Sequence, residues 1–388
     1  MTKEQKIFQM KFCSFNHMPW RFVKARTSTW PYDNADFEAP VARRELSNFL
    51  TQASIAEEAG FDWVGFGEEH CNPFGLIPNA CIAASLVAAK TSRIRLGVFG
   101  AALPLLNPVK VAEEYAWVDT FSGGRLEAGF MRGVPQNYFV YNGDVDGSWD
   151  RLEEAAQLIV RLWTADEPVS WRSKYYTFNR ISLWPRCAQH PHPPILMTAG
   201  SERSARVAAR LRARVGEIHL KQRDGLSRVR ETFDRYADIA DQFSWQPGPD
   251  VFVVGVYACI ARSDEEAFQK MEPALNYTYN VISGGFKSQE PKPTPLAEPA
   301  KMPEESLTLK QRIEAGLVVC GSARTAAEQI AHIHERTGAG IISLHFQVGN
   351  MSHTDVCRSI KLCGDIVIPS LNRRRPDALM ARKDERTA

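Results

Sequence analysis

The sequence predicts an α/β protein whose strands close into a (β/α)8 barrel, and two observations lead to this fold class. Short apolar runs, typical of buried parallel strands, alternate with helical patterns along nearly the whole chain. Eight such runs suit a closed barrel, whereas an open doubly wound sheet is the competing arrangement. The predicted strands are Phe8–Phe15, Trp63–Phe66, Ile94–Phe99, Leu126–Phe130, Ile195–Ala199, Glu217–Leu220, Val251–Ile260 and Ile341–Phe346.

Amphipathic segments between these runs are predicted to be the crossover helices of the barrel. In Val41–Gly60 the apolar side chains fall on one helical face, and Gly60 stands where a C-terminal cap belongs. The same position between two predicted strands is held by Asn79–Lys90, Val109–Phe121, Arg151–Thr164, Ser201–Arg212 and Thr325–Thr337.

Residues 1–371 are expected to form a single barrel domain with two additions. The segment Tyr175–Pro194 is rich in proline and predicts an irregular excursion before the fifth strand. Residues 284–311 carry five prolines and are too polar to pack as core, so we expect a mobile loop inserted before the eighth strand. Residues 372–388 are highly charged and are expected to form a disordered tail.

Charge and composition indicate a globular protein that acts on a small molecule. Lysine plus arginine total 47 against 45 acidic residues, and the formal charge of +2 does not favour a nucleic-acid partner. The N-terminus lacks an apolar signal region and no apolar run approaches ~18 residues, so a cytoplasmic location without membrane insertion is expected. The eight cysteines are scattered singly, without the paired spacing of a zinc site.

The stretch GEEHCNPFG, which runs from Gly67 to Gly75, follows the second predicted strand and is the first candidate for chemistry. In a (β/α)8 barrel the loops after the strands converge on one mouth, so Glu68, Glu69 and His70 would face it. A helix cap or a pair with an arginine is the alternative for each of these side chains. The apolar stretch after the third strand, from Phe99 onward, is either a wall for a flat ligand or the top of the barrel core.

Two further strand ends predict an anion site. Arg132 follows the fourth strand beside Gly133, where a planar guanidinium can reach an anionic ligand. After the fifth strand, Gly200, Ser201 and Ser204 lead straight into a helix, so backbone N–H groups and two hydroxyls would point at one spot. This arrangement suits a phosphate. Structural pairing with a neighbouring acid is the alternative for Arg132, and an ordinary serine N-cap explains Ser201 equally well.

Several well-known motifs are missing from the chain. It has no GxGxxG after a strand, no P-loop motif, no HExxH and no GxSxG. Their absence disfavours a built-in nicotinamide fold, a P-loop NTPase, a zincin and an α/β-hydrolase. Among the classes considered, a barrel that binds a phosphate-bearing cofactor is still compatible with the sequence.

Several longer motifs resemble those of the bacterial luciferase-like family of flavin-dependent monooxygenases. They are AKTSRIRLG at 89–97, LPLLNPV at 103–109, FSGGRL at 121–126 and the closing SIKLCGDIVIP at 359–369. The opening stretch Lys11–Met18 is most similar to the branch of limonene monooxygenase-like proteins. The resemblance covers nearly the whole chain outside the termini and the proline-rich loop.

This resemblance implies a TIM barrel that binds reduced FMN (FMNH2), supplied by a separate NAD(P)H-flavin reductase. The implied reaction with O2 forms a C4a-(hydro)peroxyflavin, which oxygenates a small apolar organic substrate. It also implies a homodimer formed through Asn79–Lys90 and Val109–Phe121. The two alternatives are a deazaflavin-dependent oxidoreductase and a non-catalytic flavin-binding or partner subunit of a luciferase-like complex.

Residue by residue, the resemblance implies two sets of contacts. The flavin-binding set is Phe99, Gly100, Met131, Arg132, Gly133, Gly200, Ser201 and Ser204, with Arg132 and the two serines on the phosphate. Phe99–Gly100 matches a peptide that is often cis in relatives. Asn16 and His17 would border the substrate.

One position departs from the family pattern. Catalytic members usually have Glu-His-His after the second strand, whereas this chain has Glu68-Glu69-His70. Glu69 could replace the missing histidine, because a carboxylate desolvated beside an apolar flavin face can transfer protons near neutral pH. His70 is the other catalytic candidate.

Overall fold

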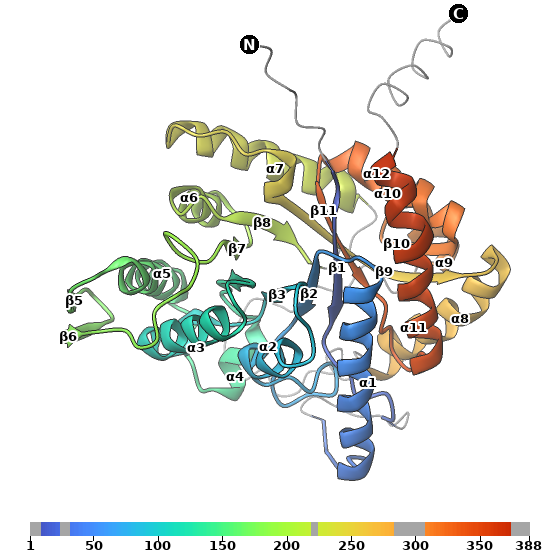
Figure 1. The fold of residues 1–388 in the computed structure, drawn as a ribbon, viewed down its shortest axis with the longest axis horizontal. Helices are drawn as coiled ribbons and strands as arrows, with labels where there is room; N and C mark the ends of the chain where they lie inside the picture. The colour runs from blue at the N-terminus through green and yellow to red at the C-terminus, as the bar shows by residue number, and fades with distance from the viewer. Residues whose placement is uncertain (1–8, 24–31, 219–223, 283–306, 374–388) are drawn as a thin grey trace, which may run out of the picture.

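A computed structural model of the chain describes residues 9–23, 32–218, 224–282 and 307–373 (Figure 1). The predicted mobile loop therefore lies outside the described residues up to 306, and the predicted tail does so from 374. Residues 309–311, at the end of the predicted loop, begin a short helix with Thr308 as its N-cap.

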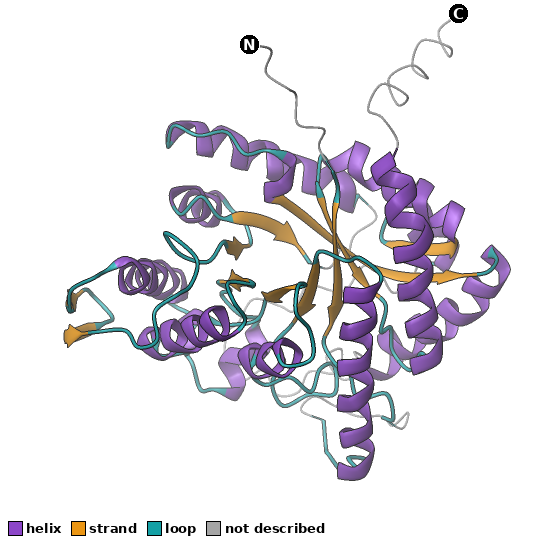
Figure 2. Ribbon diagram, viewed as in Figure 1, coloured by secondary structure: helices purple, strands orange, loops and turns teal. Residues whose placement is uncertain are grey.

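Eight parallel strands close into a barrel at the centre of the molecule, with the helices around them (Figure 2). The order around the barrel is β9-β11-β1-β2-β3-β4-β7-β8, and β8 pairs with β9 to complete the ring. The predicted (β/α)8 fold is therefore confirmed. The strands are β1 (Lys11–Asn16), β2 (Trp63–Phe66), β3 (Arg95–Val98), β4 (Leu126–Gly129), β7 (Ile195–Met197), β8 (Arg214–Glu217), β9 (Phe252–Ala261) and β11 (Ile341–His345).

The helices follow the strands in the order that the barrel requires. The crossover helices are α1 (Ala39–Glu58), α2 (Ala80–Ala88), α3 (Pro108–Phe121), α5 (Ser148–Thr164), α6 (Glu202–Arg210), α7 (Gly225–Gln242), α8 (Asp264–Tyr277), α10 (Ala323–Thr337) and α11 (His353–Leu362). Three shorter helices are α4 (Pro135–Val140), α9 (Leu309–Glu314) and α12 (Ile368–Arg373). Gly60 has a φ of +81°, so the predicted glycine stop of α1 is present two residues beyond the helix.

Three strands were missed and one was misplaced by the sequence patterns. The excursion before β7 contains the antiparallel hairpin β5 (Val169–Arg172) and β6 (Thr177–Ile181). The strand β10 (Val318–Ser322) pairs with the second half of β9, from Tyr257 onward, where the pairing with β11 ends. The predicted sixth strand, Glu217–Leu220, overlaps β8 only at Glu217. The strand begins earlier, at Arg214, where a charged residue close to the end of the preceding predicted helix gave no strand pattern.

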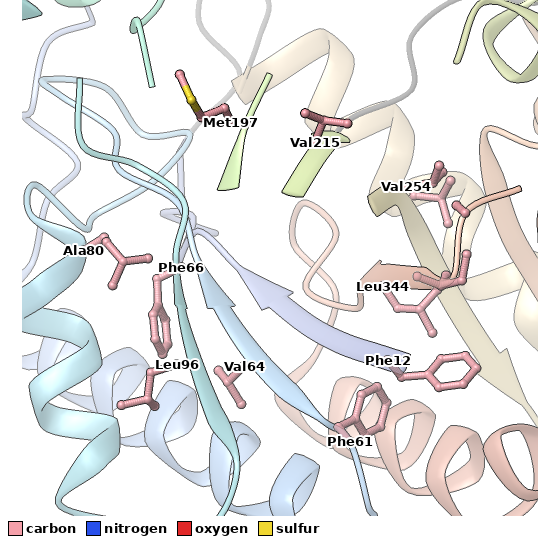
Figure 3. Close-up of a cluster of buried hydrophobic side chains, with 14 of the residues drawn as sticks. Phe12, Phe61, Val64, Phe66, Ala80, Leu96, Met197, Val215, Val254 and Leu344 are labelled. Carbon is pink, nitrogen blue, oxygen red and sulfur yellow. The ribbon is translucent and has the colours of Figure 1, made fainter. Parts of the chain in front are cut away.

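Side chains alternate between the barrel interior and the helix layer. One core cluster, packed between strands and helices, includes Phe66 and Leu96, which lie near Ala80 of α2 in Figure 3. A separate cluster fills the interior and consists of Cys13, Phe15, Trp63, Phe99, Leu196, Val253 and Ile341. A Cβ on Gly97 would lie 2.4 Å from the ring of Phe99, so the glycine leaves room for that ring. The interior is thus closed below the mouth.

A buried ion-pair cluster fills the end of the barrel opposite the mouth. The carboxylate of Glu127 is 1 % exposed and lies 2.5 Å from both Arg95 and Arg214. Burial raises the pKa of Glu127, while the two guanidinium groups act in the opposite direction. A broad cleft opens at this end, but these charges are already paired there, which indicates a structural role.

Candidate active site

The loop after β2 brings Glu69 to the mouth of the barrel beside His17. Glu69 Oε1 lies 4.0 Å from His17 Nδ1, and Asn72 Nδ2 donates to Glu69 Oε2 at 3.2 Å. A Cβ on Gly75 would lie 2.8 Å from both Glu69 Cγ and the His17 carbonyl, so only glycine fits this tight packing. The structure therefore brings together one predicted catalytic residue and one predicted substrate residue.

Aromatic side chains surround His17. Its ring centroid lies 4.6 Å from that of Phe15 and 5.1 Å from that of Phe74. A small pocket at this place is lined by Phe15, Asn16, His17, Pro19, Phe74, Tyr257, Thr278, Ile282, His345, Gln347 and Gly349. The lining is largely apolar, with a few polar groups that can orient a ligand.

Asn16 lines this pocket, but its amide also forms two hydrogen bonds within the protein. Its Nδ2 donates to Gln52 Oε1 at 2.8 Å, and its Oδ1 accepts from the backbone N–H of Met18 at 2.6 Å. These bonds hold the chain where it leaves β1. Asn16 therefore positions His17, which follows it directly.

His345 is a residue of the mouth that the sequence patterns did not single out. It is the last residue of β11, its ring lies 4.3 Å from that of Phe15, and it is 2 % exposed. Burial, reinforced by the nearby His17, lowers the pKa of His345 well below its usual range. The sequence feature that could have pointed to His345 is a histidine at the C-terminal end of a mostly apolar strand.

His70 does not share the pocket of Glu69. Its Nε2 lies 3.1 Å from Glu68 Oε1, and its Nδ1 lies 2.9 Å from the hydroxyl of Tyr141. Glu68 Oε2 in turn accepts from the backbone N–H of Ala80 at 3.3 Å. This chain of hydrogen bonds, in which His70 is buried and Tyr141 is exposed, faces a separate cavity between the loop and helices α2 and α3. The structure therefore separates the two predicted catalytic residues.

Ser201 and Ser204 form a capping box at the start of α6. Ser201 Oγ accepts from the Ser204 N–H at 3.2 Å, and Ser204 Oγ accepts from the Ser201 N–H at 3.0 Å. A Cβ on Gly200 would meet no atom within 4 Å, so the space beside this turn is open. Ser201 is therefore an N-cap, as the alternative interpretation predicted. This cap leaves room for a ligand at the same helix start.

Arg132 reaches the same end of the barrel. Its guanidinium carbon lies 4.9 Å from the ring of Trp149 in the first turn of α5. The next residue, Asp150, forms an ion pair with Arg203 of α6, two residues beyond Ser201. Within the described residues, Arg132 has no carboxylate within ion-pair distance. A cation, two hydroxyls and an open helix start fit a phosphate group.

The remaining predicted flavin contacts belong to the loops after β3 and β4. The ring of Phe99 turns into the barrel interior and stacks on Phe15 at 5.9 Å. A Cβ on Gly100 would lie 2.2 Å from Glu68 Cβ, so the loops after β2 and β3 are in close contact. The two cis peptides of the described residues both precede proline, so Phe99–Gly100 is trans, the favoured form.

Met131 and Gly133 flank Arg132. Met131 forms an isolated bridge with Ala102 and packs against the interior cluster. Gly133 has a φ of +84°, and a Cβ there would lie 3.0 Å from that of Ala102. The chain thus turns at Gly133, directly after the arginine.

Comparison with known proteins gives the family. Residues 22–340 match the model described as luciferase-like monooxygenase. The chain belongs to this family. The predicted family resemblance and the predicted enzyme class are thereby confirmed.

Two curated members of the luciferase-like monooxygenases are similar over much of their length. The oxygenase component of a flavin-dependent trigonelline monooxygenase from Acinetobacter baylyi is 28% identical over 287 residues, covering 72% of this chain and 73% of that protein. An FMNH2-dependent dimethylsulfone monooxygenase from Pseudomonas putida is 28% identical over 229 residues, covering 55% and 58% respectively. Both names agree with the predicted cofactor, reduced FMN.

Among solved structures, the monooxygenase RslO1 from Streptomyces bottropensis has the same barrel. Its TM-score is 0.74 at 25% identity, covering 93% of this chain and 99% of that one.

In the described part of the present chain, no helix is long and apolar enough to cross a bilayer.

Proposed function

We propose that this chain is the oxygenase component of a two-component monooxygenase. It takes reduced FMN from a separate NAD(P)H-flavin reductase and uses O2 to oxygenate a small apolar organic substrate. The observation that carries the proposal is one barrel mouth with an open turn at Gly200 and an aromatic pocket around His17, beside which Glu69 lies. The bound reduced flavin supplies the electrons that activate O2.

The phosphate of FMN is held by Arg132, Ser201 and Ser204. The guanidinium and the helix start provide charge and hydrogen bonds in one place. Gly200 lets the ligand approach the backbone closely, because no atom occupies the space beside it. The loops that carry Phe99, Gly100, Met131 and Gly133 border the ring system.

Glu69 acts as the acid or base that transfers the proton in the reaction. Its carboxylate reaches the mouth, and Asn72 and His17 orient it. His70 was the other catalytic candidate, but its two ring nitrogens contact Glu68 and Tyr141 in a different cavity. The geometry favours Glu69, and His70 then holds the loop that carries it.

The substrate is placed at the barrel mouth beside His17, next to the aromatic pocket. Phe15, Phe74 and Tyr257 give that pocket apolar walls, which exclude water from the reacting atoms. Asn16 holds the chain that positions His17. Because a methylene more or less in such a pocket changes selectivity by only ~1–3 kcal/mol, a family of related substrates is expected.

Isotope labelling tests this function. The protein, mixed with photoreduced FMN and 18O2, is expected to place one 18O atom in a product from a panel of ketones, aldehydes, terpenes and N-heterocycles. Mass spectrometry of the products makes the measurement, with heat-inactivated protein as the control. A deazaflavin-dependent reductase would consume no oxygen, and a non-catalytic subunit would give no labelled product from any substrate.

A homodimer is proposed through α2 and α3. Four large apolar side chains are exposed on this face, and two of them, Trp117 and Phe121, are 52 % and 64 % exposed with their ring centroids 4.2 Å apart. The other two are Ile82 and Leu86 of α2. Exposed apolar groups gathered on adjacent helices are typical of a subunit interface.

Phe121→Glu is expected to convert the dimer into a monomer, because a charge would be buried without a partner. Sedimentation velocity gives the mass of the particle before and after the change. Ile366→Glu, an exposed apolar position elsewhere, is the matched control and should leave the dimer intact. A monomeric unmodified protein would contradict the proposed interface.

A further inference from the structure

Arg235 lies behind the turn that precedes α6. It belongs to α7, and its Nη2 donates to the carbonyl oxygens of Ala199 at 3.1 Å and Gly200 at 3.3 Å. The same nitrogen is 3.4 Å from Thr232 Oγ1. One guanidinium therefore holds two successive peptide groups of the turn from the α7 side.

Among the residues that the structure describes, no carboxylate forms an ion pair with Arg235. Its hydrogen-bond partners are neutral oxygens, and its buried Nε has no hydrogen-bond partner among the described residues. Arg206 and Arg210 of α6 each contact a glutamate instead, namely Glu202 and Glu153. Arg235 thus leaves a positive charge next to the turn, where an anion would be attracted to it.

The two hydrogen bonds also orient the donors of the turn. In a trans peptide the C=O and the following N–H point in opposite directions. Because Arg235 holds the carbonyls of Ala199 and Gly200, the N–H groups of Gly200 and Ser201 point away from α7. The Ser201 N–H donates to Ser204 Oγ and completes the capping box. The Gly200 N–H is thereby fixed on the side opposite the arginine.

From these contacts we infer that Arg235 is a positioning residue for the flavin phosphate. It fixes the peptide planes of the Ala199–Gly200 turn and adds positive charge to the site from behind. It acts through the backbone, whereas Arg132 contacts the phosphate itself. This inference rests on the proposed binding of FMN at the start of α6.

Calorimetric titration with oxidised FMN and with riboflavin, which lacks the phosphate, tests the inference. The unmodified protein is expected to bind FMN at least about tenfold more tightly than riboflavin, because charged hydrogen bonds favour the phosphate. Arg235→Met should reduce this FMN-to-riboflavin preference about tenfold while riboflavin affinity stays within about twofold. Arg235→Lys keeps the charge but not the two-carbonyl contact. Its FMN-to-riboflavin preference should therefore lie between that of the unmodified protein and that of Arg235→Met.

Arg206→Met is the matched control, because it removes a paired arginine from the same region and should leave the preference unchanged. Thermal unfolding of each variant checks that the barrel is intact. An unchanged preference in Arg235→Met, or an equal loss of FMN and riboflavin affinity, would overturn the role of Arg235. If the unmodified protein itself does not distinguish FMN from riboflavin, the proposed phosphate site fails, independently of Arg235.

Discussion

Replacing Arg132 by methionine is expected to weaken the binding of FMN about 10- to 100-fold. The guanidinium is the predicted direct contact to the phosphate, and hydrogen bonds to charged groups contribute roughly 1.5–3 kcal/mol. Riboflavin affinity should change little, because riboflavin offers no phosphate to this side chain. Titration calorimetry with both flavins gives the two dissociation constants directly.

Two variants serve as controls for Arg132. Arg132→Lys keeps the charge and should recover part of the FMN affinity, although an ammonium cannot reproduce the planar fork. Arg210→Met removes an arginine that Glu153 already pairs, so FMN affinity should be unchanged. Equal binding of FMN by the unmodified protein and Arg132→Met would rule out this phosphate contact.

The second large effect is expected at Glu69. Glu69→Gln should lower the rate of product formation by about 10²- to 10⁴-fold, the range typical for loss of a positioned acid or base. The amide keeps the size of the side chain and can still contact Asn72, so FMN affinity should be retained. Single-turnover measurements with saturating reduced FMN and excess substrate separate this chemical effect from binding.

His70→Gln is the matched comparison one residue along the chain. It disturbs the contacts with Glu68 and Tyr141 but leaves the aromatic pocket unchanged, so its effect on turnover should stay within about tenfold. Rates are compared per FMN-bound protein, which corrects for any loss of stability. Our assignment fails if Glu69→Gln turns over normally or if His70→Gln loses as much activity.

Much of the barrel could be predicted from local patterns. The run Trp63–Phe66 is apolar throughout and Ile341–Phe346 is mostly apolar, because strands of a parallel barrel are covered on both faces. The prediction failed where pairing is decided by distant partners. The strand β10 pairs only with the far half of β9, and the start of β8 carries the charged Arg214, whose guanidinium pairs with Glu127 of β4.

The separation of Glu69 from His70 arises in the loop after β2, because that strand ends at Phe66. The two-residue period of a strand does not extend through this loop, so the sequence pattern could not assign the two side chains to different sides. The structure shows that Glu69 lies beside His17, whereas His70 contacts Glu68 and Tyr141. Within β11, a count by two does place His345 inside, two residues beyond Ser343 and four beyond Ile341.

By itself, the sequence determined the fold class and the family, because periodicity and short motifs are local properties. It also predicted, from the strand ends that carry Arg132 and Ser201, where the flavin phosphate would bind. Only the tertiary structure decided which side chains meet. Glu69 reaches His17, which is 52 positions away, and Arg235 reaches the turn at Ala199 from another helix. Such contacts depend on closure of the barrel, which brings the ends of distant strands to one mouth.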